Sequence, residues 1–293
     1  MRKQFVATIN GLLDDDPRLV ILLGDIGVFG FRDAFDRHPN RVFNIGILEQ
    51  ASIGFAAGLA REGYIPVFHS IAPFVAERAY EQIKVDFGYQ ALTGNFVTVG
   101  ASYDYAALGC THHCPGDVQA LTAIPGLRVI VPGTAAEFDK LFRAGYAGVG
   151  PAYFRLSESY HREHVTIESE RATKISSGSV GTVIVVGPLL SVVVEACRDL
   201  DVTILYYTTV APFDRVTLAA SAKGNKIAVV EPFYEGTLAH QVACAFPDSA
   251  ISQVAVGVPR RFLTNYGTAA EHDESCGLTP SAVRRRLRKF FDA

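Results

Sequence analysis

The length, composition and charge of the chain exclude several classes of protein. With 293 residues, 49% of them hydrophobic and 19% charged, the chain is long enough for two globular domains and too apolar for a disordered protein. The formal net charge is −3 and no basic stripe is present, which predicts that the chain does not bind nucleic acid. No apolar stretch approaches the ~20 residues of a membrane span, so we expect no membrane insertion. Five cysteines without regular spacing are typical of a reducing compartment and predict a cytoplasmic protein.

Short runs rich in β-branched residues alternate with helical segments through the first half of the chain. The runs that predict buried strands are 18–25, 41–47, 64–70, 95–101 and 127–132. The segments between them predict helices over 48–62, 73–89 and 134–148. The last of these helices opens with Thr134 and Glu137 in the spacing of a capping box.

The second half repeats this alternation after a polar stretch. Residues 151–156 form another apolar run, and the polar residues that follow predict a linker or a surface hairpin. Strands are then predicted over 181–187, 202–210, 225–231 and 250–257. A C-terminal helix is expected to begin at Thr279, with Pro280 in its first turn, and to close on the run 284–286, whose arginines would lie near the negative helix end.

This order of elements predicts the fold class and the domain boundaries. Alternating strands and helices are typical of α/β proteins, in which mainly parallel sheets are covered by helices on both faces. We therefore expect two doubly wound α/β domains over 1–160 and 176–293, joined by a linker over 161–175.

The helix predicted over 48–62 carries the densest concentration of unusual residues. Gly54 and Gly58 are spaced by one helical turn, and each glycine destabilises a helix by about 1 kcal/mol relative to alanine. We therefore expect another backbone to pack closely on that face. Glu49 lies in the first turn, where a carboxylate is either a common partner of the helix dipole or a functional acid.

The segment GCTHHCPGD at 109–117 allows three interpretations: a metal site, a redox pair or a loop that binds a small molecule. Cys110 and Cys114 are separated by three residues rather than the two of a zinc knuckle, and no second ligand pair lies elsewhere, so zinc is disfavoured. A reducing compartment disfavours a disulfide.

The chain resembles the C-terminal half of transketolases, and most closely the half-length subunit of split transketolase-like enzymes. The resemblance is carried by FNIGILEQASIGFAAGLAREGYIPVFHSIAPFVAERAYEQIKVD at 43–86, GCTHHCPGDVQALTAIPGLRVIVPGTAAE at 109–137 and VVEPFYEGTLAHQVACAF at 229–246. It implies a transketolase pyrimidine-binding domain over 1–160 and a transketolase C-terminal domain over 176–293.

The resemblance also implies thiamine diphosphate chemistry, in which a two-carbon ketol unit passes from a ketose donor to an aldehyde-type acceptor. The family's glutamate that matches Glu49 binds N1′ of the cofactor's aminopyrimidine ring and shares a proton with it. Phe74 is expected to stack on that ring. Further residues expected at the cofactor are Ile47, Asp25, Arg78 and Tyr80.

For the histidine segment, the resemblance favours the interpretation as a substrate loop. His112 is expected to contact the donor's oxygens and to donate a hydrogen bond where negative charge develops, so it is the second predicted catalytic residue beside Glu49. His113 and His69 are expected to contact substrate as well.

No metal–diphosphate fingerprint of the family, a GDG motif followed by asparagines, is present in the sequence. The turn GDIG at 24–27 lies before Glu49 and resembles only a short acidic turn of the pyrimidine side. We therefore expect an N-terminal subunit with the GDG…N motif to hold Mg²⁺ and the diphosphate, the cofactor to lie across the subunit interface, and the assembly to be an α2β2 heterotetramer.

Three positions depart from the usual sugar-phosphate contacts of the family. Leu108 stands where an acidic residue contacts a sugar hydroxyl, Glu158 where an arginine grips phosphate, and Gly100 where a histidine precedes the loop. The donor and acceptor therefore stay open, and an unusual substrate of specialised metabolism is plausible. Two alternatives also stay open: the β subunit of a 2-oxoacid dehydrogenase E1-type enzyme, and a non-catalytic subunit that stabilises a partner.

Overall fold

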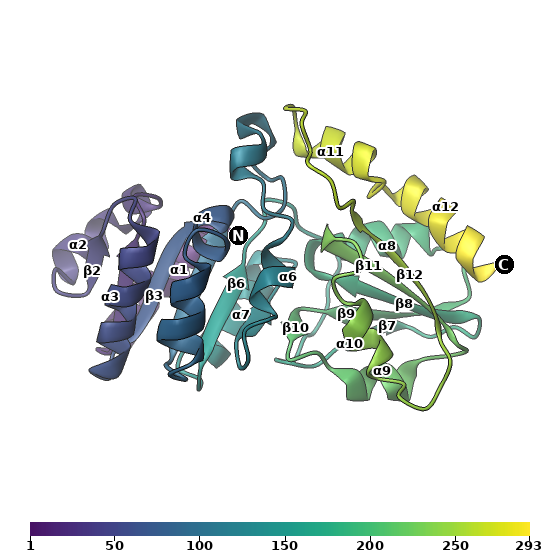
Figure 1. Ribbon diagram of the computed structural model, residues 1–293, viewed down its shortest axis with the longest axis horizontal. Coiled ribbons are helices and arrows are strands. Elements are labelled where there is room, and N and C mark those ends of the chain that lie inside the picture. The colour runs from purple at the N-terminus through teal and green to yellow at the C-terminus, as the bar shows by residue number, and fades with distance from the viewer.

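The computed structural model describes residues 1–293 as two α/β halves that lie side by side (Figure 1). The first half is built on a seven-stranded sheet and the second on a five-stranded sheet, both mostly parallel. The predicted fold class is confirmed.

Six of the strands in the first sheet come from the first half of the chain. They are β1 (Leu19–Leu23), β2 (Val42–Asn44), β3 (Ile65–Ile71), β4 (Gly94–Val99), β5 (Arg128–Ile130) and β6 (Pro151–Arg155). With β10 (Thr209–Ala211), which comes from later in the chain, the strand order of the sheet is β10-β5-β6-β4-β3-β1-β2. Five of the six lie within the predicted apolar runs or differ by a residue at one end, and β6 lies in the apolar run 151–156. Their side chains are almost all buried because helices cover both faces, as parallel sheets require.

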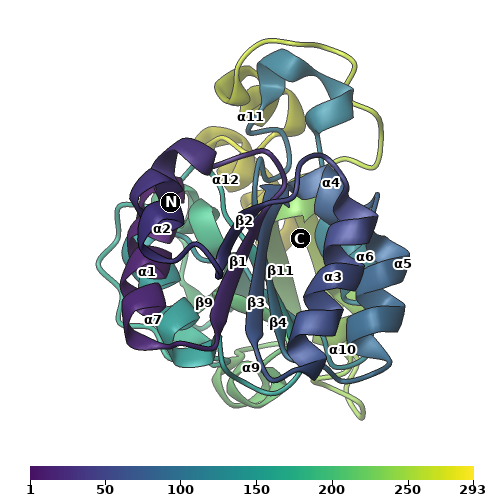
Figure 2. The same cartoon turned by 90° about the vertical axis from the view of Figure 1, so that its left-hand side faces the viewer.

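Helices flank this sheet as two separate layers (Figure 2). One face carries α1 (Arg2–Asp15) and α7 (Ala135–Gly145), and the other carries α3 (Glu49–Arg61), α4 (Ala72–Ala76), α5 (Tyr80–Gln82) and α6 (Asp117–Leu121). The short α2 (Arg32–Arg37) precedes β2. Helix α1 lies outside the predicted elements, although Phe5, Ile9, Leu12 and Leu13 bury one helical face.

The single helix predicted over 73–89 is wrong, because the structure breaks it into α4, α5 and a π-helical turn at Ile83–Gly88. The break follows α4, where the N–H groups of Glu77 and Arg78 both donate to the carbonyl oxygen of Pro73, at 3.0 and 3.1 Å. The extra residue in that turn interrupts the regular helical repeat at Arg78.

The second sheet has the order β12-β11-β8-β9-β7, with β7 (Thr173–Ser176) antiparallel at its edge. Its other strands are β8 (Gly181–Val186), β9 (Val202–Tyr207), β11 (Lys226–Tyr234) and β12 (Ser252–Val258). The surrounding helices are α8 (Leu190–Ala196), α9 (Arg215–Ser221), α10 (Ala239–Ala243), α11 (Ala269–Cys276) and α12 (Pro280–Phe291).

Two predictions for this half need correction. The strand predicted over 202–210 ends at Tyr207, and β10 (Thr209–Ala211) leaves the second sheet to pair antiparallel with β5 at the open edge of the first. The C-terminal helix does begin with Pro280, but it runs to Phe291, so the arginines at 284–286 lie in its middle and not at its end.

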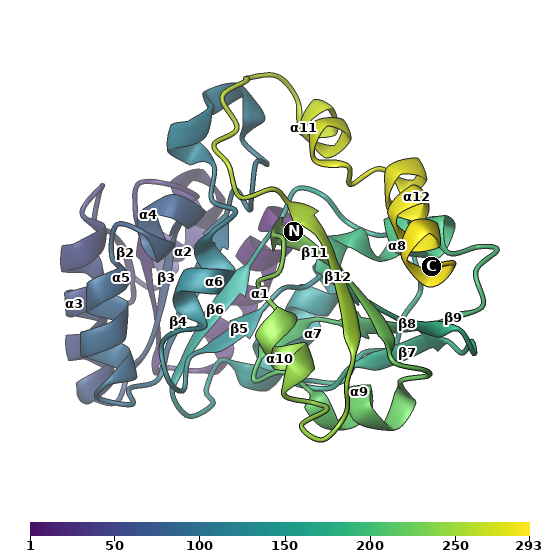
Figure 3. The ribbon, with the colours of Figure 1, turned by 45° about the vertical axis from the view of Figure 1, so that its right-hand side comes forward.

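At one edge of the molecule, a segment of the second half lies against a segment of the first half. The segment between β12 and α11, residues 259–268, runs beside the short helical turns around residues 106–112 of the first half (Figure 3). This edge also carries α4 and the end of β3 that precedes it. Ligands of open α/β sheets bind outside such carboxyl ends of the strands.

Candidate active site

The first turn of α3 places a carboxylate in a nearly closed environment. Glu49 is the first residue of the helix and its exposed fraction is 2%. Its Oε2 accepts a hydrogen bond from Nη1 of Arg78 at 2.9 Å. Its Oε1 is buried and has no hydrogen-bond partner. A buried acceptor without a partner is uncommon and destabilising, so it marks a position where a ligand atom can bind.

An aromatic ring and a histidine continue this cluster. The guanidinium carbon of Arg78 lies 4.2 Å from the ring centroid of Phe74, and the Phe74 ring meets the imidazole of His112 edge-on at 5.4 Å. Arg78 comes from the turn after α4, whereas His112 ends the 3₁₀ turn Cys110–His112. The structure therefore brings together four predicted site residues from three segments: Glu49, Phe74, Arg78 and His112.

A polar turn precedes α3 at the same sheet edge. Asp25, which follows β1, has φ +55°, and its N–H donates to Oδ1 of Asn44 at 3.0 Å while the Asn44 amide donates back to Oδ1 of Asp25 at 3.0 Å. Oδ1 of Asn44 also accepts from the N–H of Gly46 at 3.3 Å. Asn44 therefore links the Asp25 turn to the start of α3. Asn44 was not among the predicted site residues, although an asparagine at the end of a strand was a usable signal.

Three other residues predicted for the site make no hydrogen bond or ring contact with the Glu49 cluster. Ile47 precedes α3 with an exposed side chain, and Tyr80 lies half-buried in α5. His69 is fully buried on β3: its Nδ1 bonds the carbonyl oxygen of Val97 at 2.8 Å and its ring packs on Phe5 of α1 at 4.5 Å. Burial lowers the pKa of His69 to about 4. A contact between His69 and substrate stays a prediction.

The two neighbouring histidines of the histidine loop, residues 106–114, face different surroundings. His112 is half-buried against Phe74, whereas His113 is buried against the second domain, where its ring meets that of His272 at 5.2 Å. Burial, chiefly, and then the neighbouring His272 lower the pKa of His113. His113 is therefore not brought to the Glu49 cluster.

All five cysteines are free, including both cysteines of the histidine loop. Cys110 is exposed, and the buried Cys114 thiol donates to Oε1 of Glu77 at 3.5 Å. Burial raises the pKa of Cys114, so its neutral thiol is favoured. No group of three or more His, Cys, Asp or Glu side chains is arranged to hold a metal ion.

The outer face of α3 is open. Gly54 and Gly58 are exposed, and an added Cβ at Gly58 would meet no atom within 4 Å. Large apolar side chains are exposed beside them, at Leu48 and Phe55. Within this chain no second backbone packs on the glycines, and the predicted interface on that face stays a prediction.

The three positions that depart from the family pattern have distinct environments. Leu108 is largely exposed, and Glu158 is an exposed residue whose backbone N–H donates to Asp104 at 3.0 Å. Gly100 has φ +78°, and a Cβ there would lie 2.8 Å from the ring of Tyr105. A histidine at position 100 would therefore require this turn to change.

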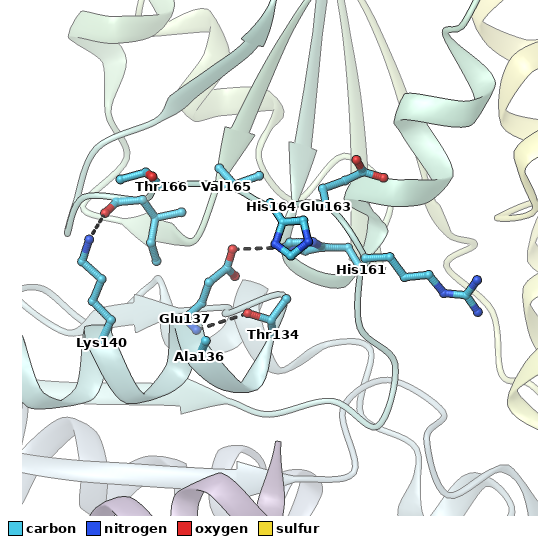
Figure 4. A pocket seen from close by; sticks show the side chains of 11 residues that line it. Thr134, Ala136, Glu137, Lys140, His161, Glu163, His164, Val165 and Thr166 are labelled. Atoms are coloured by element: carbon cyan, nitrogen blue, oxygen red, sulfur yellow. Dashed lines mark hydrogen bonds and ion pairs between the residues drawn. The ribbon is translucent and has the colours of Figure 1, made fainter.

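A second buried polar cluster joins the domains on the other side of the first sheet. Glu137 at the start of α7 faces His161 (Figure 4). The hydroxyl of Tyr206 of β9 donates to the same carboxylate. The adjacent cavity, of about 440 Å³, lies between α7 and the coil at residues 161–167. The N–H of Glu137 donates to Thr134 Oγ1 as predicted, but the Glu137 carboxylate accepts from the N–H of Gly133 rather than completing a capping box.

No helix has the length and apolarity that crossing a membrane requires. Residues 1–163 match the family described as transketolase, pyrimidine binding domain. This match covers more than half of the chain.

Similar proteins include full-length matches of the same size. The chain is 38% identical over 291 residues to an uncharacterized 33.6 kDa protein in the fasciation locus of Rhodococcoides fascians, covering 98% of this chain and 93% of that protein. It is 26% identical over 302 residues to a subunit of the apulose-4-phosphate transketolase of Phocaeicola vulgatus, covering 99% and 96%. It is 28% identical to 1-deoxy-D-xylulose-5-phosphate synthase 2 of Geobacter sulfurreducens, of which it spans only 48%.

Solved structures with the same fold include a split transketolase and a longer one. A split-gene transketolase, an inactive β4 tetramer, superposes with a TM-score of 0.87 at 27% identity, covering 99% of this chain and 98% of that one. The transketolase of Campylobacter jejuni shares the fold with a TM-score of 0.84 at 16% identity, over 98% of this chain and 46% of that one. The chain belongs to the transketolase family, in which its pyrimidine-binding and C-terminal domains make it a homologue of the half-length subunits of split enzymes.

Proposed function

We propose that this chain supplies the pyrimidine-side half of the active site in a thiamine diphosphate-dependent enzyme that transfers a two-carbon ketol unit from a ketose to an aldehyde-type acceptor. The observation that carries the proposal is the Glu49 carboxylate, buried to 2% exposure, with one oxygen held by Arg78 and the other without a partner.

The residues present fit the pyrimidine ring of this cofactor. The unpartnered Oε1 of Glu49 would hold a proton at N1′, and the ring of Phe74 would offer a flat apolar surface. Arg78 fixes Oε2 and packs over Phe74, which orients both groups. The bound cofactor supplies an electron sink for breaking a carbon–carbon bond.

His112 would act on the substrate rather than on the cofactor. Its Nδ1 lies 3.0 Å from Oγ1 of Thr111. With Nδ1 accepting from that hydroxyl, Nε2 would carry the proton and would donate to a substrate oxygen that gains negative charge. A positioned donor of this kind contributes about 100-fold or more to a rate.

The other half of the site would come from an N-terminal subunit with the GDG…N motif, which would hold Mg²⁺ and the diphosphate in an α2β2 heterotetramer. The open glycine face of α3 and the exposed side chains of Leu48, just before this helix, and Phe55, within it, support an interface there. The similar proteins that are themselves subunits of apulose-4-phosphate transketolases support it as well.

The test is titration of thiamine diphosphate and Mg²⁺ into the chain alone and into the chain assembled with its partner subunit. We expect binding only in the assembly, and ketol transfer from a ketose without release of CO₂. Tight binding by the isolated chain would contradict the shared site. Consumption of a 2-oxoacid with release of CO₂ would favour the E1-type alternative, and an assembly that binds cofactor without turnover would favour the non-catalytic one.

A further inference from the structure

The second domain touches the histidine loop on both sides of His112. On the N-terminal side Gly109 has φ +73°, and a Cβ there would lie 2.6 Å from the ring of Tyr266. Tyr266 belongs to the segment 259–268, which runs along the loop (Figure 3). The positive φ favours glycine at position 109, and the missing side chain leaves room for this ring.

On the C-terminal side His113 packs against α11. The ring of His272 meets His113 at 5.2 Å and stacks on Tyr103 at 5.1 Å, and it is fully buried. The hydroxyl of Tyr103 donates to Oδ1 of the neighbouring Asp273 at 2.6 Å. These contacts join the histidine loop and the turn before it to one face of α11.

Between the two contacts the chain has little freedom. The N–H of His112 donates to the carbonyl oxygen of Gly109 at 3.0 Å, and that of Cys114 donates to Ser102 at 2.7 Å. His112 is thus held on a short turn whose ends are packed against the second domain. Its ring is directed at Phe74 in the first domain.

From this arrangement we propose that the second domain positions His112 for reaction, with Tyr266 and His272 as positioning residues. The inference rests on the proposed function of His112. Neither residue has a hydrogen bond or ring contact with His112, so each would act through its neighbour: Tyr266 through Gly109 and His272 through His113. Small displacements of a reacting group change rates steeply, so loosening either contact is expected to lower turnover.

The test measures ketol transfer by the assembled enzyme with Tyr266→Ala and His272→Ala, alone and combined with His112→Ala. We expect each single substitution to lower kcat/KM for the donor about tenfold and to leave the dissociation constant of the cofactor unchanged. In the His112→Ala background we expect the further loss to disappear, because there is no longer a ring to position.

A matched control is Phe262→Ala, which removes another exposed aromatic side chain of the same segment and is expected to leave activity unchanged. Hydrogen exchange of residues 106–114 gives a readout that does not depend on activity: Tyr266→Ala should accelerate it, and Phe262→Ala should not. Tyr266 is 69% exposed, so its substitution does not threaten folding as that of His272 does.

The outcomes separate this inference from the proposed function. If His112→Ala has no effect on turnover, the proposed role of His112 fails. If His112→Ala lowers turnover while the Tyr266 and His272 effects stay additive with it, or if Tyr266→Ala leaves loop exchange unchanged, the positioning role is overturned.

Discussion

Two buried glutamates of the first domain occupy equivalent local positions and have opposite surroundings. Glu49 and Glu137 each lie in the first turn of a helix, α3 and α7, with exposed fractions of 2% and 5%. The carboxylate of Glu137 accepts from the N–H of Gly133 and the hydroxyl of Tyr206, each at 2.7 Å, and lies 3.0 Å from Nε2 of His161. Both of its oxygens are satisfied.

Glu49 differs because only one of its oxygens has a partner. The comparison shows that burial of a carboxylate does not by itself indicate a functional site. A buried carboxylate with a full set of donors stabilises a junction, here between α7, the coil at His161 and β9. The vacant oxygen of Glu49 can instead accept a hydrogen bond from a ligand. Substitutions at the two glutamates should therefore affect different measurements.

The largest effect is expected for Glu49→Gln in the assembled enzyme. The substitution keeps the size of the side chain but removes the carboxylate that would hold a proton at the cofactor, so turnover at saturating cofactor should fall about 10²–10⁴-fold. The thermal stability of the chain should change little, because the unsatisfied buried carboxylate stabilises little. Near wild-type turnover in a folded, assembled Glu49→Gln enzyme would contradict the proposed role of Glu49 at the cofactor.

The converse is expected for Glu137→Ala. Removal of this carboxylate leaves a backbone N–H, a tyrosine hydroxyl and an imidazole buried without their acceptor, which should lower the free energy of unfolding by about 3 kcal/mol. Urea denaturation of the chain measures this loss. Glu137→Gln retains one acceptor oxygen and should lose less. Turnover per folded molecule should stay unchanged. A decrease in it would show that Glu137 is not merely structural.

Local sequence patterns were sufficient for the strands, because a parallel sheet buries both faces of each apolar run. They left Glu49 open between a partner of the helix dipole and a functional acid, and only the family resemblance pointed to the second. They did not predict what surrounds Glu49. The contact of Arg78 with Glu49 depends on the break after α4, which helical periodicity over 73–89 conceals.

Contacts between residues distant in the sequence were not predictable at all. The pairing of His113 with His272 requires α11 of the second domain to lie over the histidine loop. In the same way, the satisfied state of Glu137 depends on Tyr206, which comes from the other sheet. Only the fold reveals which buried polar group has its partners.

The buried His69 of β3 should make the stability of the chain depend on pH. The pKa of His69 is about 4 in the folded chain, against 6.5 for an unperturbed histidine, so the unfolded chain binds more protons between these values. The contribution of His69 to stability should therefore fall by on the order of 3 kcal/mol as the pH drops from about 6.5 to about 4.

The matched variant is His69→Asn, whose amide nitrogen can replace Nδ1 in the hydrogen bond to Val97 and does not titrate. Urea denaturation at pH 7 and pH 4.5 should show a smaller loss for the variant than for the wild type. Equal losses in the two proteins would assign the acid sensitivity to other groups.

The smallest effects are expected from the aromatic neighbours of the two glutamates, and they should be reciprocal. Phe74→Leu keeps an apolar side chain but removes the flat ring over which Arg78 packs, so cofactor affinity should fall about tenfold with little change in stability. Tyr206→Phe keeps the ring but removes a donor to Glu137, so the free energy of unfolding should fall by about 1 kcal/mol with unchanged cofactor affinity. Calorimetry of the cofactor and urea denaturation, applied to both variants, measure the two quantities. If both variants changed the same quantity, the two clusters would be coupled, and the vacant oxygen of Glu49 would no longer distinguish the ligand site from the domain junction.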